Sequence, residues 1–269
     1  MRFEFEKWSR LAIAVMAASA LAGCYRVDGP NGGHDAGSDA DGDSDSDTEP
    51  DSDSETDADT DSGSETGLAD ECVLGTHAGS ASITNSSHLE DYRGYTAIQG
   101  DLLILSPLCH TLEALHCLEH VTGDVEISGT YNLTDLDGLD SLSSIGNQLR
   151  LGNMAGMYGN KTLSDIGALA SLEEVDSLTI YLNSSLSSLA GLEGVTSLNV
   201  LHVEGNEVLT SLDGLSGVAD IGYALMAFND SLPDCEICEL WYQAGAEPES
   251  FFLMDNLADE CTPFPDNCP

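Results

Sequence analysis

The sequence predicts a mainly β fold, a solenoid of stacked coils, and three observations support it. A thirteen-residue pattern with an apolar residue at every third position recurs along the chain, as in LTDLDGLDSLSSI at 133–145. A short segment of alternating apolar residues lies between successive copies, and an Asn precedes most copies by three residues. Because a period of three matches neither a helix nor a strand, each copy is expected to run as short extended and turn segments.

Residues 1–23 have the features of a lipoprotein signal peptide. Basic residues precede an apolar run at 11–23 that is short for a membrane span. The run ends in Leu21-Ala22-Gly23-Cys24, which resembles a bacterial lipobox, and the resemblance implies cleavage before Cys24 and acylation of that residue. Several acyl chains would anchor the protein to a membrane. In such lipoproteins an Asp after the acylated Cys is associated with retention in the inner membrane. Because Tyr25 stands there instead, the resemblance favours the outer membrane or cell surface. An ordinary signal peptide and a transmembrane anchor are the alternatives.

Residues 24–67 are predicted to be the acylated Cys followed by a disordered, extended acidic tether. The stretch 35–66 holds fourteen carboxylates, no Lys or Arg and almost no apolar residues. The Asp-rich run 39–43 invites comparison with a calcium-binding EF-hand loop, but Gly37 and Thr48 stand where that loop requires acids. Weak, diffuse association with calcium remains open, whereas a specific metal site is not expected.

Residues 68–269 form the predicted folded domain, which is strongly acidic. It has 31 Asp and Glu against Arg93, Arg150 and Lys161, a net charge of −28. Such a field opposes binding to nucleic acid and to anionic lipid surfaces, so no nucleic-acid partner is expected.

The repeat predicts about seven coils and a C-terminal cap. Copies begin at residues 86, 109, 133, 163, 186, 209 and 232, and the alternating segments read GDLLIL, GDVEIS, NQLRLG, SLTIYL and NVLHVE. One coil cannot bury its own apolar row, but stacked coils share a core. Asn tolerates left-handed backbone, so the four corner Asn are expected to turn the chain there: Asn160, Asn183, Asn206 and Asn229. The late aromatic residues are expected to pack the cap.

The stretch YTAIQGDLLIL at 95–105, the LxxLxxLxxLxxI copies and the Asn corners together resemble receptor L-domain repeats. The resemblance covers about residues 72–260 and implies a right-handed β-helix-like, leucine-rich-repeat-like solenoid. With its acidic tether, the chain also resembles lipid-anchored bacterial surface proteins of the myxobacterial type. No hormone-contacting motif of the animal receptors can be matched here.

With Cys24 acylated, seven cysteines remain, and export favours disulfides: Cys72, Cys109, Cys117, Cys235, Cys238, Cys261 and Cys268. The C-x-x-C at 235–238 is open to a zinc or redox interpretation. Its spacing coincides with Leu positions of the last copy, so disulfides to Cys261 and Cys268 are favoured. Cys72 paired with Cys109 or Cys117 would staple the first coil, and the odd count leaves one thiol over. His110, His116 and His120 are expected to face solvent.

The candidate binding site is a seven-residue insertion in the segment GNMAGMYG, because insertions in solenoids often form binding loops. Met154, Met157 and Tyr158 have no place in the repeat, and Arg150 and Lys161 flank them. Alternatively, the loop covers a neighbouring coil. The second candidate is the outward strand face: Leu103, Glu126, Arg150, Thr179, Tyr181, His202 and Glu204.

The chain contains no G-x-S-x-G, H-E-x-x-H or glycine-rich phosphate loop, so neither an enzyme nor a cofactor is expected. The predicted function is non-catalytic recognition or adhesion by a lipid-anchored surface protein that binds an extracellular protein or glycan. The alternative is a structural envelope protein whose acidic groups associate through divalent cations.

Overall fold

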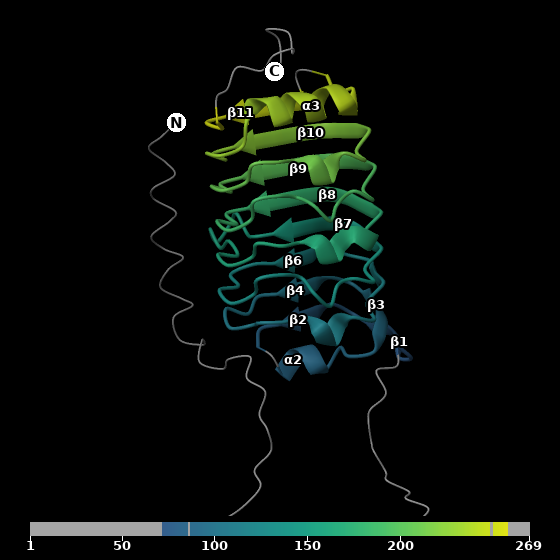
Figure 1. The fold of residues 1–269 in the computed structure, drawn as a ribbon. Coiled ribbons are helices and arrows are strands. Elements are labelled where there is room, and N and C mark those ends of the chain that lie inside the picture. The colour runs from purple at the N-terminus through teal and green to yellow at the C-terminus, as the bar shows by residue number, and fades with distance from the viewer. Residues whose placement is uncertain (1–71, 86, 248–249, 258–269) are drawn as a thin grey trace, which may run out of the picture. The chain divides into compact units, whose positions relative to one another are not determined.

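A computed structural model describes residues 72–85, 87–247 and 250–257, and this part of the chain is mainly β. Its strands form an 11-stranded sheet in which the pairings between named strands are parallel. Figure 1 shows the later strands side by side in chain order, with β11 and α3 beyond β10. The predicted signal peptide, Cys24 and the acidic tether lie outside the described residues.

The strands are β1 (Gly75–Ala78), β2 (Ala81–Ile83), β3 (Tyr95–Gln99), β4 (Leu102–Ile104), β5 (His120–Val121), β6 (Val125–Ile127), β7 (Ser144–Leu151), β8 (Glu174–Tyr181), β9 (Ser197–Glu204), β10 (Asp220–Ala227) and β11 (Phe251–Met254). The α-helices are α2 (Ser87–Glu90) and α3 (Asp234–Ala244). The short 3₁₀ helices are η1 (Glu113–Leu115), η2 (Gly167–Ser171) and η3 (Asp213–Leu215).

The first half of the sheet consists of two separate ladders, and the second half of one. β1, β3 and β5 pair in one ladder, and β2, β4 and β6 pair in the other. β7 spans both ladders, because Ser144 and Ile145 continue β5 whereas Leu149 to Leu151 continue β6. From β7 to β10 each strand runs for eight residues. At the break, the Asp101 and Asp124 carboxylates accept backbone N–H groups of the next unit, so these donors stay bonded.

The residues with a period of three point into the core, as predicted. Leu133, Leu136, Leu139 and Leu142 are fully buried, and they share one apolar cluster with strand residues such as Leu149. Each buried Leu contributes about 1.5–3 kcal/mol. The repeated row is therefore the main stabilising term.

The corner Asn residues are buried, but their role differs from the predicted one. Positive φ occurs at the preceding residue, for example 55° at Leu182, 71° at Gly205 and 57° at Phe228. The Asn side chain instead bridges neighbouring units. The Asn206 Oδ1 atom accepts the Asn183 backbone N–H (3.0 Å), and the Asn206 Nδ2 group donates to the Ile180 carbonyl (2.9 Å).

The same bonding recurs along the stack and forms an Asn ladder. Thr130 donates to Asn160 at its start, and Asn256, which the repeat analysis missed, continues it after β11: Thr130, Asn160, Asn183, Asn206, Asn229 and Asn256.

The last copy of the pattern, at 232–244, differs from the others. The copies were predicted to form irregular return segments, which lead from one strand to the next, but this copy forms the helix α3, so its prediction as a coil was wrong. In the five copies that begin at residues 109 to 209 the sixth residue is Gly or Ala, because it approaches the preceding unit. A Cβ atom at Gly214 would overlap the Leu189 carbonyl oxygen, and one at Gly138 would overlap that of Leu112. The last copy has Ile237 there, which cannot follow the same path and is buried in α3. Gly245, in left-handed conformation, ends the helix.

Candidate functional site

The insertion after β7 forms a short, internally bonded loop, residues 153–158. The Asn153 N–H donates to the Tyr158 carbonyl (2.8 Å), and the Tyr158 N–H donates to the Asn153 carbonyl (3.0 Å). Inside this pair, the Gly156 N–H donates to the Asn153 side-chain oxygen (3.1 Å) and the Met157 N–H to the Met154 carbonyl (3.3 Å). The backbone of the loop is therefore held in one shape.

A polar network on the sheet fixes the base of the loop. The Asn153 amide donates to the Glu126 carboxylate, which is only 8% exposed and also accepts the Ser128 hydroxyl (2.9 Å). Arg150 lies 3.6 Å from Glu126 and 2.8 Å from Asp124. Because the buried carboxylate is bonded and faces a cation, the loop has a stable platform.

The loop presents apolar side chains outward. Met154 is 48% exposed and Met157 is 50% exposed. Met157 also has φ of 55°, a left-handed conformation that costs about 1–2 kcal/mol for a residue with a side chain. Tyr158 is half-buried, and its ring packs beside the backbone of Gly156 within the loop. Exposed, strained apolar residues on a fixed backbone are typical of a recognition surface.

The other predicted binding residues lie beside this loop but are engaged within the fold. Lys161 places its ammonium 5.5 Å from the Tyr131 ring centroid. Arg150 is paired with carboxylates, as described above. Tyr181 is 9% exposed and meets His202 edge-on. Burial first, and then the Glu204 carboxylate, raise the pKa of the Tyr181 phenol. These three residues shape the surroundings of the loop.

The outward strand face, the second candidate, is a self-bonded polar surface. Gln148 donates to the Thr179 hydroxyl (2.7 Å), and the His202 ring nitrogen lies 2.7 Å from the Glu204 carboxylate. Thr179 and Glu126 are buried. The face therefore offers few unengaged polar groups outside the loop.

Cysteines and histidines gather at the N-terminal end of the described chain. Cys72 and Cys117 form a disulfide, and His116, which is half-buried rather than exposed, places Nε2 3.2 Å from the Cys117 sulfur. These three form the one group within the described ranges whose potential metal-ligand atoms lie within 4.8 Å of one another. Since the disulfide occupies both sulfurs, the group is structural. Cys109 is a buried thiol that donates to the Thr111 carbonyl (3.3 Å).

Cys235 and Cys238 are both disulfide-bonded, which argues against the zinc interpretation of this pair. Their predicted partners, Cys261 and Cys268, lie outside the described residues.

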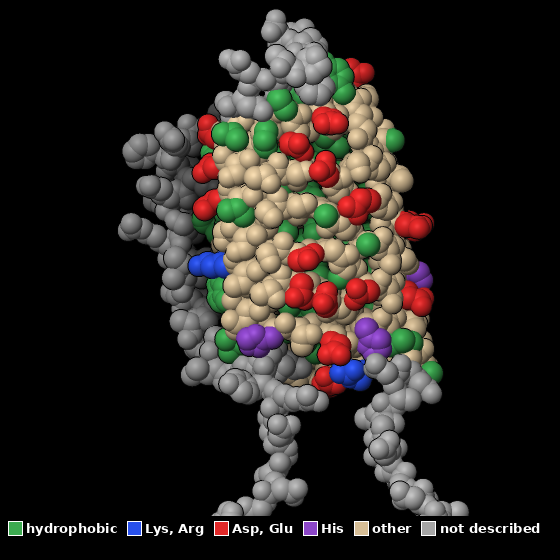
Figure 2. Space-filling view, in the orientation of Figure 1, with side chains coloured by type: hydrophobic (Ala, Val, Ile, Leu, Met, Phe, Trp, Pro, Cys, Tyr) green, Lys and Arg blue, Asp and Glu red, His purple; other side chains and the backbone are tan. Residues whose placement is uncertain are grey.

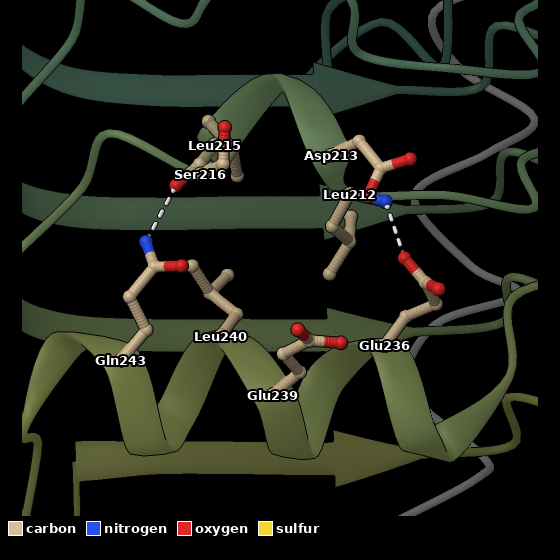
Figure 3. A pocket seen from close by; sticks show the side chains of 8 residues that line it. All are labelled: Leu212, Asp213, Leu215, Ser216, Glu236, Glu239, Leu240 and Gln243. Carbon is tan, nitrogen blue, oxygen red and sulfur yellow. Dashed lines mark hydrogen bonds between the residues drawn. The ribbon is translucent and has the colours of Figure 1, made fainter.

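A cavity of about 40 Å³ lies between η3 and α3, and Figure 3 shows the side chains that line it. Gln243 donates to the carbonyls of Leu215 (3.0 Å) and Val218 (2.7 Å), and Glu236 accepts the Leu212 N–H (3.0 Å). The cavity has room for only a few water molecules. Its polar groups attach α3 to the preceding unit, so it is a structural seam.

The surface is acidic: on the face drawn in Figure 2, Asp and Glu side chains far outnumber Lys and Arg. On the return segments, the Asp135 carboxylate first, then slight burial, and then Asp140 and Asp165 raise the pKa of Asp137. Like charges therefore stand close together here.

No family model, no curated protein and no solved structure matches the chain. Within the part that the structure describes, no helix combines the length and the apolar character needed to cross a bilayer. The described residues define a mainly β protein of parallel strands, with a hydrogen-bonded loop that exposes apolar side chains after the central strand β7.

Proposed function

We propose that this chain is an exported, lipid-anchored protein of the outer membrane or cell surface. Cys24 would be the acylated anchor and residues 24–67 the acidic tether. The folded part would be a right-handed β-helix-like solenoid of the receptor L-domain kind. The parallel strands that follow one another in chain order, at the repeat distance of the sequence, support this architecture.

Its function is non-catalytic recognition or adhesion toward an extracellular protein or glycan, and the loop 153–158 makes the contact. The observation that carries this proposal is the loop itself. Its backbone is closed by its own hydrogen bonds and tied to a buried carboxylate, yet Met154 and Met157 remain half-exposed. A loop that only covered its neighbouring unit would bury these side chains. Pre-organisation of this kind lowers the entropy lost on binding.

A second candidate, a structural envelope protein linked by divalent cations, is supported by the carboxylates around Asp137. This candidate predicts that binding requires calcium and does not change when residues of the loop are substituted, whereas recognition predicts the opposite.

The test is binding of the oxidised full chain, with Cys24→Ser to keep an anchor out of the measurement, to intact cells and their extracellular matrix. Tyr158→Ala and Met154→Ser are compared with Val208→Ser, a matched control because Val208 is also exposed but lies outside the loop. Each protein is measured in millimolar calcium and in chelator.

Recognition predicts saturable binding that survives chelation, falls at least about tenfold with the loop variants and is unchanged with Val208→Ser. Binding that needs calcium and ignores the loop variants would instead establish the acidic envelope protein. Absence of binding to cells and matrix would refute both.

A further inference from the structure

The left-handed corner residues point to a larger binding surface than the loop alone. Where the chain leaves a strand and turns toward the Asn ladder, several units have a residue with positive φ. Glycine is the residue suited to that conformation, and it is present at Gly129 and Gly205. Three other units carry Leu182, Phe228 and Asp255, although a side chain is disfavoured in that conformation.

These residues continue the apolar surface of the loop along the stack. Gly159, next to Tyr158, packs against the Leu182 Cβ atom, and the Leu182 side chain lies over Gly205. The Gly205 N–H donates to the carbonyl of Ala227 (3.0 Å), the residue before Phe228. The Phe228 N–H in turn donates to the Met254 carbonyl (2.9 Å). The apolar residues along this path are called the apolar ridge: Met157, Tyr158, Leu182, Phe228 and Met254. Met254 pairs with Ala227, and the residue after it, the corner residue Asp255, is acidic.

The ridge is accessible and long enough for a segment of a partner protein. Phe228 is 44% exposed and Met254 is 56% exposed, while Leu182 is half-buried. It crosses the ends of β7 to β11, four steps of the sheet, or about 19 Å at about 4.8 Å for each step. About 12 residues of an α-helix span the same distance at 1.5 Å for each residue.

Charge restricts the class of partner. Beside the ridge, positions 23 residues apart carry Lys161, Ser184, Glu207 and Asp230, and Asp255 precedes the last Asn of the ladder. The three acids are exposed and lie toward the Phe228 end, where no cation stands at the corresponding positions. Acidic or phosphate-rich partners are therefore repelled at that end, and basic ones are attracted.

We infer that the apolar ridge docks a cationic amphipathic protein segment, with its apolar face on Leu182 and Phe228 and its basic residues over Glu207, Asp230 and Asp255. This inference rests on the proposed recognition function and deepens it. It extends the contact surface from the loop to the ridge, and it specifies a partner segment that is basic. Flexible Met side chains at both ends of the ridge suit contact with such a segment.

The test is fluorescence anisotropy of a labelled Leu/Lys peptide with helical spacing, titrated with the full-length Cys24→Ser chain at physiological ionic strength. A Leu/Glu peptide of the same spacing and a scrambled Leu/Lys peptide serve as probes of charge and of amphipathic order. The variants are Phe228→Gly and Leu182→Gly, because glycine removes the side chain and accepts the backbone conformation. Tyr223→Ser is the matched control: an exposed aromatic residue within β10, five residues before Phe228 and outside the ridge.

The expected result is that Phe228→Gly and Leu182→Gly weaken binding of the Leu/Lys peptide at least about tenfold, with melting temperatures equal to or above that of the parent. Tyr223→Ser should bind normally, and the other two peptides should bind weakly. Equal binding of the scrambled peptide, or unchanged binding by the Phe228→Gly chain, would overturn the inference.

The same set of variants identifies a different occupant. Self-association in sedimentation, or binding to phosphatidylcholine vesicles, that requires Phe228 while the Leu/Lys peptide is ignored would also overturn it. If cell binding depends on Tyr158 and Met154 but not on Phe228, the recognition function stands and only the ridge inference fails.

Discussion

The units before β7 and those after it are held together in different ways. Before β7 each unit has two short strands of two to five residues, separated by a break. After it, β8, β9 and β10 are each continuous for eight residues, and the Asn ladder runs beside the strand ends. At the ladder position the early units have Ser106 and Thr130 instead. The Cys72–Cys117 disulfide spans these same early units.

The difference shows that one repeat can be stabilised by either of two devices. A buried amide ladder bonds each unit to the next and makes them depend on one another. A disulfide restricts the unfolded chain without requiring strong contacts between units. The early units have shorter strands and are linked by the disulfide, whereas the later units are linked by the Asn ladder.

Breaking the ladder should have the largest effect. Asn206→Ala removes the acceptor of the Asn183 N–H and Nδ2 groups and the donor to the Ile180 carbonyl. Three buried groups lose a partner at about 1–3 kcal/mol each, so the free energy of unfolding should fall by about 5 kcal/mol. Urea denaturation measures this. Asn147→Ala, at an exposed position, should change it by less than about 0.5 kcal/mol. Equal effects for the two variants would refute the ladder's role.

Removing the disulfide should have the next largest effect, confined to the early units. For a separation of 45 residues, the chain-entropy model gives about 4 kcal/mol. In the double variant Cys72→Ser, Cys117→Ser, amides of β1 to β4 should exchange hydrogen much faster, while those of β8 to β10 serve as an internal control. Uniform acceleration across the sheet would show that the two halves unfold as one.

Extending the ladder should produce a smaller gain. Thr130 already donates its N–H (3.2 Å) and hydroxyl (2.8 Å) to the Asn160 oxygen. In Thr130→Asn, a side chain of similar size gains a donor for the Ile104 carbonyl, by analogy with Asn160 and Ile127 (2.8 Å). Stability should rise by about 0.5–1 kcal/mol in the same denaturation assay. A loss would mean that the early units cannot accept an Asn rung.

Charge on the return segments should have the smallest effect. Since Asp135 raises the pKa of Asp137 in the folded state, the folded protein binds that proton more tightly than the unfolded chain. The repulsion therefore weakens the fold at neutral pH and is relieved as the pH falls toward this raised pKa. Asp137→Asn should raise the melting temperature slightly at pH 7, and the gain should shrink in acid and in high salt. A gain that is independent of pH would contradict this origin.

The sequence predicted the core well because the repeat reports burial directly: Leu133 to Leu142 follow it and are buried. It placed the Asn corners but not their chemistry, since a preference for left-handed backbone and a bridging amide give the same residue type. The helix α3 was missed although Ile237 replaces a residue that must be small, and this signal is visible only once neighbouring units are stacked. The anchoring of the loop by Glu126 could not be predicted, because it depends on the register of β6 against β7.

The most direct test of the account concerns Met157, the strained and exposed residue of the loop. Melting temperature and cell binding are measured together for Met157→Gly in the Cys24→Ser chain. If the side chain is kept for recognition, glycine should leave the melting temperature equal or higher, because it relieves the left-handed strain, and should weaken binding at least about tenfold. A lower melting temperature with unchanged binding would show that Met157 serves the fold, and it would contradict the proposed site.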